Sequence, residues 1–459
     1  MSYLPKSDPQ SNPATDAPAA QSRPGTDLWR PLWRAHQQRP RPTLVGKVEA
    51  EIAIVGGGLE GLSLARELSS RGKRVVLVEA QQLSQGATGA SAGIVAPQLI
   101  HQSPDDVTKR LGAAQAERFL KLLAGAGKRT FELIGERKRD VGASDAGFIA
   151  PVRTTTGARR LAAIVGQWQR FRSDLKLLAA DETRALTGAM GYAGALLDPT
   201  GGWLNPVAYG ELLATDAEST GAVIFLRSAV SSVERAGSRW RLACSGGSVI
   251  ARQVVLCANG GNAEIAPALR RSILPLHVCQ MATLPLDPQV RRTILPQGHA
   301  MTDVERDVFS IRFDPQGRLI TAYPMSERLR EPGRLNELVN RRLGMLLPGF
   351  RATPLEHAWT GVAWLNSDLL PRVVRLDDGL FAVQACNGRG IALSTAIGHE
   401  FGAWLAGGAK DDCAVAIQKP RAIPGYVFAR YLPALLMNAT LAARQVRRAV
   451  LPRSSTERE

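Results

Sequence analysis

Residues 51–80 read EIAIVGGGLEGLSLARELSSRGKRVVLVEA, and this stretch decides the fold. The apolar run 51–55 predicts a buried strand, 59–72 predicts an amphipathic helix that ends at a glycine, and 74–80 predicts a second strand. Strands that are apolar without alternation are typical of parallel sheets covered on both faces. The stretch therefore predicts a βαβ unit of an α/β fold.

The turn between the first strand and the helix carries the pattern GxGxxG as Gly56, Gly58 and Gly61. Gly56 permits a tight turn, Gly58 lets backbone amides approach a pyrophosphate, and Gly61 lets the helix pack on the strand. The N-terminus of the helix also favours phosphate charge. A bare glycine pattern would be weak evidence, but its place between a strand and a helix predicts a dinucleotide site.

Glu79 ends the second strand, where a carboxylate can bind both hydroxyls of an adenosine ribose; the alternative is an ordinary surface acid. Two further stretches then favour a flavin over a nicotinamide cofactor. Residues 86–93 (GATGASAG) could run backbone amides along a pyrophosphate to a flavin edge. Residues 387–391 (NGRGI) precede a helix whose N-terminus would favour a reduced, anionic flavin, although alone they indicate only a helix-opening turn.

Composition narrows the class of protein without naming a partner. The chain has 57 Lys and Arg against 41 Asp and Glu, a net charge of +16, and part of the excess follows residue 418. Such charge permits weak binding to nucleic acid or anionic lipid but identifies neither. The five cysteines form no CxxC pair, so we expect no metal site, no disulfide framework and a cytoplasmic location. No secretory signal or membrane-spanning run is expected.

The rest of the chain predicts a second structural unit and a tail. Residues 105–140 and 157–187 contain helical patterns, 277–325 contain short strands of an antiparallel sheet, and 332–347 predict a helix. Residues 431–450 predict a basic amphipathic helix that could touch an anionic membrane, although packing on its own domain is favoured.

At this point the motifs resemble a known family. GGGLEGLSLARELSSRGKRVVLVEA followed by GATGASAGIVAP is similar to the D-amino acid oxidase or glycine oxidase superfamily of FAD-dependent oxidoreductases. The stretches 280–323, HAWTGVAWLNSDLLPRV and CNGRGIALST resemble its gamma-glutamylputrescine oxidoreductase-like branch. The resemblance runs from about residue 27 to residue 443, with the motifs in the family order.

The resemblance implies a Rossmann-type FAD-binding domain built from discontinuous segments and an α+β substrate domain whose antiparallel sheet covers the flavin. We expect the domains to comprise a disordered leader and surface-lying segment (1–45), the FAD domain (46–110, 200–275 and 360–420), the substrate domain (111–199 and 276–359), and a basic C-terminal helix and tail (421–459).

The resemblance and the motifs together predict non-covalent FAD, because residues 86–93 offer neither of the residue types, histidine and cysteine, that hold covalent flavin in relatives. The predicted cofactor-binding residues are Gly56, Gly57, Gly58, Leu59, Glu60, Gly61, Glu79, Ala80, Gly86, Ala87, Thr88, Ser91, Ala92, Gly93, Val230, Ala258, Asn259, Gly260, Gly388, Arg389, Gly390 and Ile391.

The implied reaction is oxidation of an amine to an imine that water hydrolyses to an aldehyde or ketone, with electrons passing to oxygen or another acceptor. The predicted substrate contacts are Arg312, Arg389, His277, Tyr323 and His357, each of which could instead be structural.

Two departures from the family affect the substrate and the electron acceptor. Glycine oxidases carry a carboxylate-binding arginine where this chain has Ala363, which disfavours a simple α-amino acid. Monomeric sarcosine oxidases carry an oxygen-activating lysine where this chain has Ile320. These departures leave oxidase against dehydrogenase undecided. The alternatives are an amino-acid dehydrogenase that passes electrons to a quinone, an RNA-associated flavoprotein supported only by the charge, and a flavin-binding subunit without its own turnover.

Overall fold

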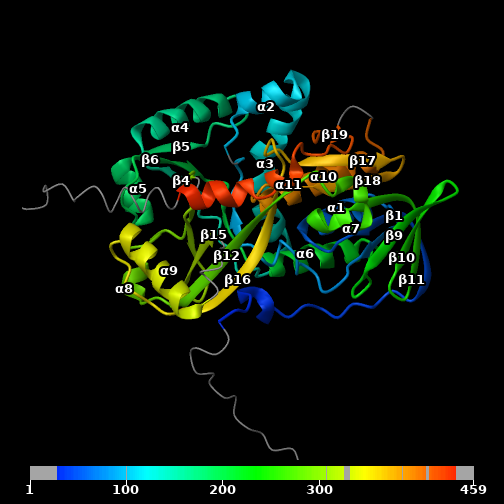
Figure 1. The fold of residues 1–459 in the computed structure, drawn as a ribbon, viewed down its shortest axis with the longest axis horizontal. Helices are drawn as coiled ribbons and strands as arrows, with labels where there is room; N and C mark the ends of the chain where they lie inside the picture. Colours follow the sequence, from blue (N-terminus) through cyan, green and yellow to red (C-terminus); the bar gives the residue numbers. More distant parts are fainter. Residues whose placement is uncertain are drawn as a thin grey trace, which may run out of the picture.

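The computed structural model describes residues 28–440, apart from residues 100, 306–307, 325–330, 385 and 410–412. The predicted leader before residue 28 and the part of the predicted C-terminal helix after residue 440 lie outside the described residues. Within the described part, two large sheets lie side by side (Figure 1).

The first sheet is the predicted parallel sheet. Its strand order is β19-β17-β18-β11-β1-β2-β8, and β9 and β10 extend from β11 as an antiparallel meander. The pairs β11–β1, β1–β2, β2–β8 and β11–β18 are parallel. The strands are β1 (Gly46–Val55), β2 (Val75–Val78), β8 (Val223–Phe225), β9 (Val230–Ala236), β10 (Arg239–Cys244), β11 (Gly247–Leu256), β17 (Arg372–Asp377), β18 (Leu380–Gln384) and β19 (Ile417–Gln418).

Helices cover one face of this sheet and the meander covers the other. Ile52, Ile54 and Leu77 pack against the helices, whereas Ala53 and Val76 pack against the meander. This two-sided burial explains why β1 and β2 are apolar without alternation. The covering helices are α1 (Leu59–Ser70), α3 (Ala113–Arg137), α6 (Pro206–Ser219) and α10 (Gly390–Leu405).

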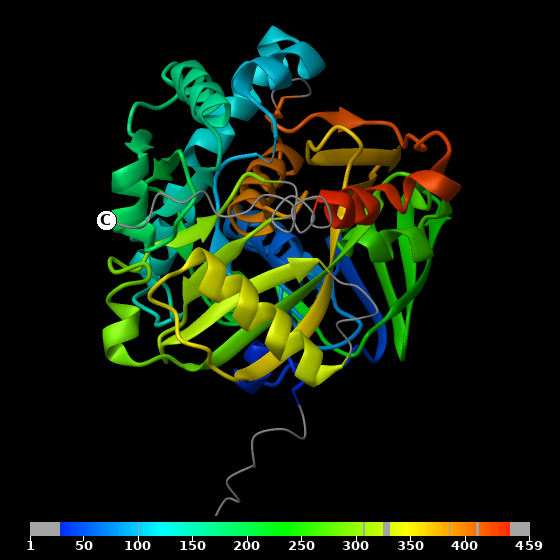
Figure 2. The same cartoon turned by 60° about the vertical axis from the view of Figure 1, so that its left-hand side comes forward.

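The second sheet has the order β16-β12-β15-β14-β13-β4-β6-β5 and is antiparallel except for the parallel pair β13–β4. Helix α9 (Pro332–Leu346) lies across one face, as Figure 2 shows, and α8 (Pro288–Arg291) lies beside it. The strands are β4 (Phe148–Val152), β5 (Lys176–Ala179), β6 (Gly194–Asp198), β12 (Leu274–Pro285), β13 (Ala300–Thr302), β14 (Ser310–Phe313), β15 (Arg318–Pro324) and β16 (Leu355–Leu365).

Two segments differ from the sequence expectation. The helical run expected at 157–187 is divided into α4 (Thr155–Trp168), strand β5 and α5 (Ala180–Thr187), because β5 pairs with β6 along the edge of the second sheet. Helix α3, expected in the substrate domain, packs on α10, and α2 (Pro104–Leu111) packs on α3. Helices α2 and α3 therefore belong to the helix layer of the first sheet.

Residues 28–45, which we call the N-terminal strap, connect the two sheets along the lower edge of Figure 1. The Ala358 amide of β16 donates to the Leu28 carbonyl at 2.8 Å, and the Leu44 amide donates to Ser228 Oγ at 2.9 Å, beside the first sheet. Between these ends, the short helix η1 (Leu32–Ala35) places Trp33 edge-on to Trp359. The strap therefore contacts both structural units.

Candidate functional site

The glycine turn at the end of β1 has the geometry that the sequence motif predicted. Gly56 has φ +112°, and a Cβ on Gly61 would lie 2.1 Å from the Gly56 carbonyl oxygen. The α1 N-cap, Gly58, offers no side-chain hydrogen bond to the helix. The first-turn amides of α1 thus lack a capping side chain from this position, which suits a phosphate group.

Glu79 lies at the end of β2 beside this turn. Its Oε2 accepts from the Gly57 amide at 2.7 Å and its Oε1 accepts from the Gln81 amide at 2.9 Å. The amide of Ser228, two residues before Val230, donates to the Glu79 carbonyl at 2.8 Å. The predicted ribose ligand, the neighbouring Ala80 and the start of β9 are therefore gathered at one corner of the first sheet.

The stretch 86–93 passes over the N-terminus of α1. Thr88 Oγ1 accepts from the Leu59 amide at 3.3 Å and would contact a Cβ on Gly58 at the same distance. Gly93 has φ +76°, and a Cβ there would lie 2.1 Å from the Leu204 carbonyl oxygen. Thr88 therefore brings this stretch against the glycine turn, and Gly93 lets its end pass close to Leu204. The predicted cofactor residues Gly86, Ala87, Ser91 and Ala92 lie on the same stretch.

Two more predicted cofactor segments meet at a residue that sequence reasoning missed. Residues 258–260 follow β11, and a Cβ on Gly260 would lie 2.1 Å from the indole of Trp364. The Asn387 amide donates to the Trp364 carbonyl at 3.2 Å, and residues 388–391 then lead into α10. Trp364 thus contacts both the 258–260 turn and the turn before α10. In the sequence Trp364 is only one of several apolar residues of a strand, so nothing there indicated this role.

Glu60 stands apart from the other residues of the glycine turn because its carboxyl group is buried. The residue as a whole is half-buried, but Oε1 is inaccessible and has no hydrogen-bond partner within the described residues. Burial raises the pKa of Glu60 to about 8, and a hydrogen bond from Ser394 of α10 partly opposes this rise. Glu60 therefore carries a proton at neutral pH.

Arg312 of β14 is buried and uses its guanidinium within the protein. Nε donates to the Ala92 carbonyl at 2.6 Å, Nη1 to Phe313 at 2.9 Å and Nη2 to Leu204 at 3.4 Å. The guanidinium also lies over the rings of Trp33 and Trp203, at 5.1 and 5.0 Å. Burial lowers the pKa of Arg312 to about 9. This geometry supports a positioning role for Arg312, which ties the second sheet to residues 86–93.

Arg389, in the turn before α10, is half-buried as a residue, but part of its guanidinium is enclosed. Its guanidinium lies 5.0 Å from the centroid of the Phe148 ring, and Nη1 is buried without a hydrogen-bond partner among the described residues. Burial lowers the pKa of Arg389 to about 10, so the side chain is still cationic at neutral pH. Arg389 is therefore suited to bind an anionic group.

The structure does not bring His277, Tyr323 and His357 together with Arg389. His277 and Tyr323 share the face of the second sheet that packs on α9, where Arg342 lies 4.9 Å from the Tyr323 ring. His277 is exposed. His357 lies beside Glu356, and burial lowers its pKa. A catalytic role for these three residues stays a prediction.

The opposite face of the second sheet looks toward residues 90–92. Ile320 packs there with Trp33 and Trp359, and Trp359 Nε1 donates to the Ala90 carbonyl at 3.2 Å. Gln280, which pairs with Trp359 across the strands, is 7% exposed, and its Oε1 has no hydrogen-bond partner in the described structure. Sequence reasoning missed Gln280, because only the strand register shows that it faces the cofactor segments.

The comparisons with known proteins decide the family. The model of the family described as DAO, FAD dependent oxidoreductase, matches residues 51–404. The chain belongs to this family. It is thus an FAD-dependent oxidoreductase. The residues present fit the cofactor, because Gly58 leaves the first-turn amides of α1 without a capping side chain at its position and Glu79 places a carboxylate beside this turn.

Three relatives illustrate the match. The oxidoreductase is 25% identical over 386 residues to gamma-glutamylputrescine oxidoreductase of Escherichia coli (strain K12), covering 82% of this chain and 88% of that protein. It is also 25% identical over 358 residues to glycine oxidase of Geobacillus kaustophilus (strain HTA426), covering 76% and 90%. The crystal structure of L-proline dehydrogenase from P. horikoshii shares its fold, with a TM-score of 0.66 and 17% identity, covering 80% of this chain and 96% of that one.

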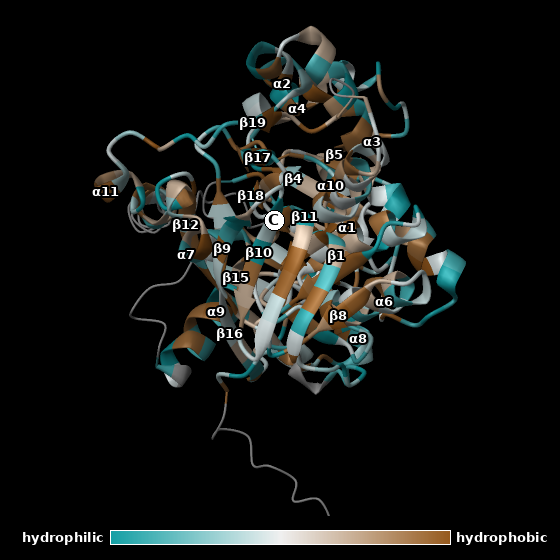
Figure 3. Cartoon of the chain, turned by 90° about the vertical axis from the view of Figure 1, so that its right-hand side faces the viewer, coloured by the Kyte–Doolittle hydropathy of each residue, from teal (hydrophilic) through white to brown (hydrophobic). Residues whose placement is uncertain are grey.

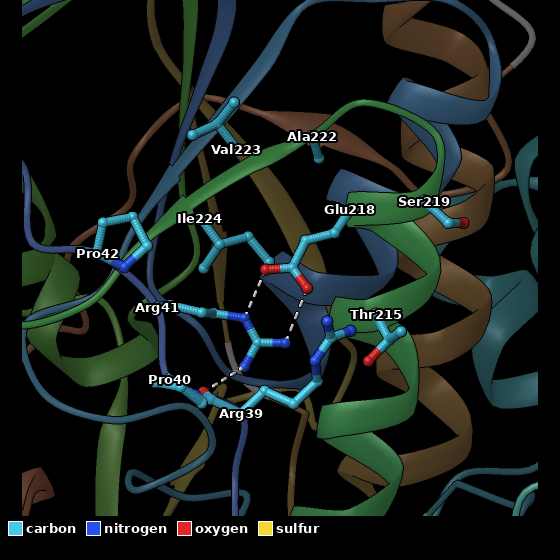
Figure 4. Close-up of a pocket in the computed structure, with 10 residues that line it drawn as sticks. All are labelled: Arg39, Pro40, Arg41, Pro42, Thr215, Glu218, Ser219, Ala222, Val223 and Ile224. Atoms are coloured by element: carbon cyan, nitrogen blue, oxygen red, sulfur yellow. Dashed lines mark hydrogen bonds and ion pairs between the residues drawn. The ribbon is translucent and has the colours of Figure 1, made fainter.

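A hollow of about 460 Å³ lies beside β8 at the edge of the first sheet of the oxidoreductase (Figure 4). The residues that line it are not among the predicted cofactor residues. Arg41 of the strap points into it and binds Glu218 through Nε at 2.6 Å and Nη2 at 3.0 Å. Arg41 Nη1 also binds Glu211 at 2.8 Å. Because two carboxylates neutralise Arg41, this hollow anchors the strap to α6 and is not the candidate site.

Arg312→Lys is expected to destabilise the oxidoreductase by about 2–3 kcal/mol, because an ammonium cannot reach three carbonyls in the fork geometry of a guanidinium. Urea unfolding measures this change, with Arg341→Lys on the exposed face of α9 as the matched control. A substrate contact would instead raise KM and leave the unfolding free energy unchanged, which would contradict the positioning role.

Proposed function

We propose that the oxidoreductase oxidises a C–N bond of an amine or a substituted amino acid that carries an acidic group. FAD would accept a hydride from the carbon next to nitrogen. The nitrogen proton would pass to water, and hydrolysis of the imine would give an aldehyde or ketone and the free amine. The chain itself would bind the substrate, orient its carbon and exclude water. The names of the relatives, gamma-glutamylputrescine oxidoreductase and glycine oxidase, support this class of reaction.

The observation that carries the acidic substrate is Arg389. The described residues provide no carboxylate partner for this half-buried side chain, whose Nη1 is enclosed, and it lies in a turn that meets the predicted cofactor segment 258–260 at Trp364. A buried cation without a counter-ion costs free energy, and a carboxylate on the substrate would offset that cost. Ala363, at the position where glycine oxidases have their carboxylate-binding arginine, makes Arg389 the preferred candidate for this contact.

Anaerobic mixing of the purified protein with a panel of amines tests the function. The panel contains gamma-glutamylated amines, polyamines, N-methyl amino acids and D-amino acids. We expect rapid bleaching of the visible flavin band by an acidic member, such as a gamma-glutamylated amine, and much slower bleaching by polyamines. If bound flavin is present and no amine reduces it, amine oxidation is wrong, and the non-catalytic subunit or the RNA-associated flavoprotein becomes the better hypothesis.

Arg389→Met should raise KM for the acidic substrate about 10- to 100-fold, because a charge-assisted hydrogen bond is lost. The rate of flavin reduction at saturating substrate should change little, since the contact is equally strong before and during hydride transfer. Steady-state kinetics measure both quantities, and Arg170→Met at an exposed position is the control. An unchanged KM would show that Arg389 does not bind the substrate.

A second candidate function concerns the electron acceptor. Ile320 is fully buried among Trp33, Trp359 and Ala282, so an apolar side chain stands where the resemblance would place an oxygen-activating lysine. This environment favours an amino-acid dehydrogenase that passes electrons to a quinone over an oxidase. After anaerobic reduction, re-oxidation by a quinone analogue should be faster than re-oxidation by air.

The proposal also includes non-covalent binding of FAD and a cytoplasmic location. Non-covalent FAD predicts that acid precipitation releases all of the yellow colour into the supernatant. The five cysteines are free thiols, which supports a reducing compartment such as the cytoplasm. The described helices include none that is long and apolar enough to cross a bilayer.

A further inference from the structure

Exposed apolar side chains are concentrated in one short segment near the end of the described chain. Of the eleven large hydrophobic residues exposed in the described structure, six lie between residues 427 and 436. We call them the C-terminal stripe: Val427, Phe428, Tyr431, Leu432, Leu435 and Leu436. Phe428 is 81% exposed and Leu435 is 62% exposed, which is unusual for side chains of this size.

The stripe is one face of a helical segment. Helix α11 (Tyr426–Ala429) continues through hydrogen bonds from Arg430 to Tyr426 and from Leu435 to Tyr431. Met437 is buried at 7% exposure, so an inner face holds the segment against the protein while the stripe points outward. Within the described residues the segment therefore packs on its own domain through Met437, whereas the side chains of the stripe do not. Figure 3 shows the segment around α11 standing out from the body of the molecule.

The segment that carries the stripe has basic residues and no acidic ones between 413 and 440. Lys419, Arg421 and Arg430 are exposed along the segment. The Ile423 amide donates to the Arg271 carbonyl at 2.7 Å, which brings the exposed residues Arg270 and Arg271 beside the start of the segment. An apolar stripe with a cationic border is the pattern of a helix that lies in a membrane interface.

We propose that the C-terminal stripe docks on an anionic lipid bilayer. Phe428, Leu432 and Leu435 would enter the boundary between headgroups and acyl chains, and Tyr431 would lie at headgroup level. The arginines would bind anionic headgroups. A second copy of this chain fits the surface less well, because a two-fold interface would bring two cationic borders together without acidic partners.

Docking does not depend on which amine is oxidised. Its functional consequence rests on the proposed function: docking would hold the reduced enzyme at a bilayer that contains a lipid-soluble quinone, which would take up two electrons and two protons to become a quinol. The partner would then be the membrane that holds the acceptor.

Vesicle co-sedimentation of the full, FAD-loaded chain tests the proposal. We expect at least about tenfold more protein on vesicles of phosphatidylglycerol and phosphatidylcholine than on phosphatidylcholine alone, with binding reduced by high salt. The variant F428S/L432S/L435S should lose about tenfold or more of this binding. The control V45S/L177S/M345S removes three exposed apolar side chains elsewhere and should bind like the parent.

Two results would overturn the proposal. One is a parent protein that binds neither kind of vesicle; if sedimentation velocity then shows a dimer that F428S/L432S/L435S abolishes, the stripe is an interface between copies. The other is vesicle binding that the triple variant retains. Anaerobic flavin reduction without vesicles, measured on the same preparations, reports the proposed amine oxidation separately, and the triple variant should keep the parent rate.

Discussion

Gly61→Ala is expected to reduce the affinity for FAD by at least about 100-fold. A Cβ on residue 61 would lie 2.1 Å from the Gly56 carbonyl oxygen and 3.3 Å from Cys257 Cβ, and backbone atoms at the end of a buried strand cannot yield. The N-terminus of α1 must therefore move away from β1, so its amides no longer meet the pyrophosphate. Titration of flavin-stripped protein with FAD, followed by flavin fluorescence, measures the loss.

Gly166→Ala is the matched control for Gly61→Ala. Gly166 lies in α4, and a Cβ there would meet no atom within 4 Å. Alanine should stabilise this helix by about 0.5–1 kcal/mol and leave FAD affinity unchanged. Near-parental affinity in Gly61→Ala would show that the turn can open without disturbing the cofactor, and the role assigned to the glycine pattern would then be wrong.

Glu60→Gln is expected to remove a pH dependence of stability. Because burial raises the pKa of Glu60 from 4.5 to about 8, the folded protein holds a proton that the unfolded chain releases above pH 4.5. The contribution of the neutral carboxyl is complete below pH 4.5 and is lost as pH rises to about 8. At 1.36 kcal/mol per pKa unit, the loss amounts to about 4–5 kcal/mol.

Urea unfolding of the FAD-loaded protein at several pH values between 5 and 9 measures this effect. Between pH 5 and 9 the parent protein should lose about 4 kcal/mol more than Glu60→Gln, which keeps the buried amide neutral throughout. Glu132→Gln, at an exposed position of α3, should follow the parent curve. Parallel curves for parent and Glu60→Gln would mean that the carboxyl is ionised in the folded protein. The negative charge of FAD phosphates near α1 would further disfavour ionisation of the Glu60 carboxyl group.

The first sheet was predictable from sequence because its signals are local. The alternation of strand, glycine turn, helix and strand in 51–80 needs no distant contact, and Glu79 occupies the end of β2 as its spacing indicated. The family motifs then placed the remaining FAD segments. The order of the second sheet was not predictable, because its pairing joins β4 to β13 and β12 to β16 across long separations in the chain.

The roles of single side chains were the least predictable part. A lone arginine in a strand can bind a substrate or a carbonyl, and only the structure shows that Arg312 donates to Ala92 and Leu204. Gln280 carried no sequence signal, since its direction depends on strand register. The apolar residues of the C-terminal stripe were visible in the sequence. Their exposure was not, because only the structure shows that Met437 lies on the inner face of the segment and the stripe on the outer face.

The N-terminal strap also fixes an order of events during synthesis of the protein. Leu28 and Trp33 leave the ribosome early, yet their partners Ala358 and Trp359 are made more than three quarters of the way along the chain. Domains begin to fold during synthesis, starting from their N-terminal parts. The Leu28–Trp33 end of the strap must therefore remain undocked until β16 has been made, although Arg41 and Leu44 can already contact α6 and Ser228. This end is made before every strand of both sheets, yet it reaches its place only after β16 exists.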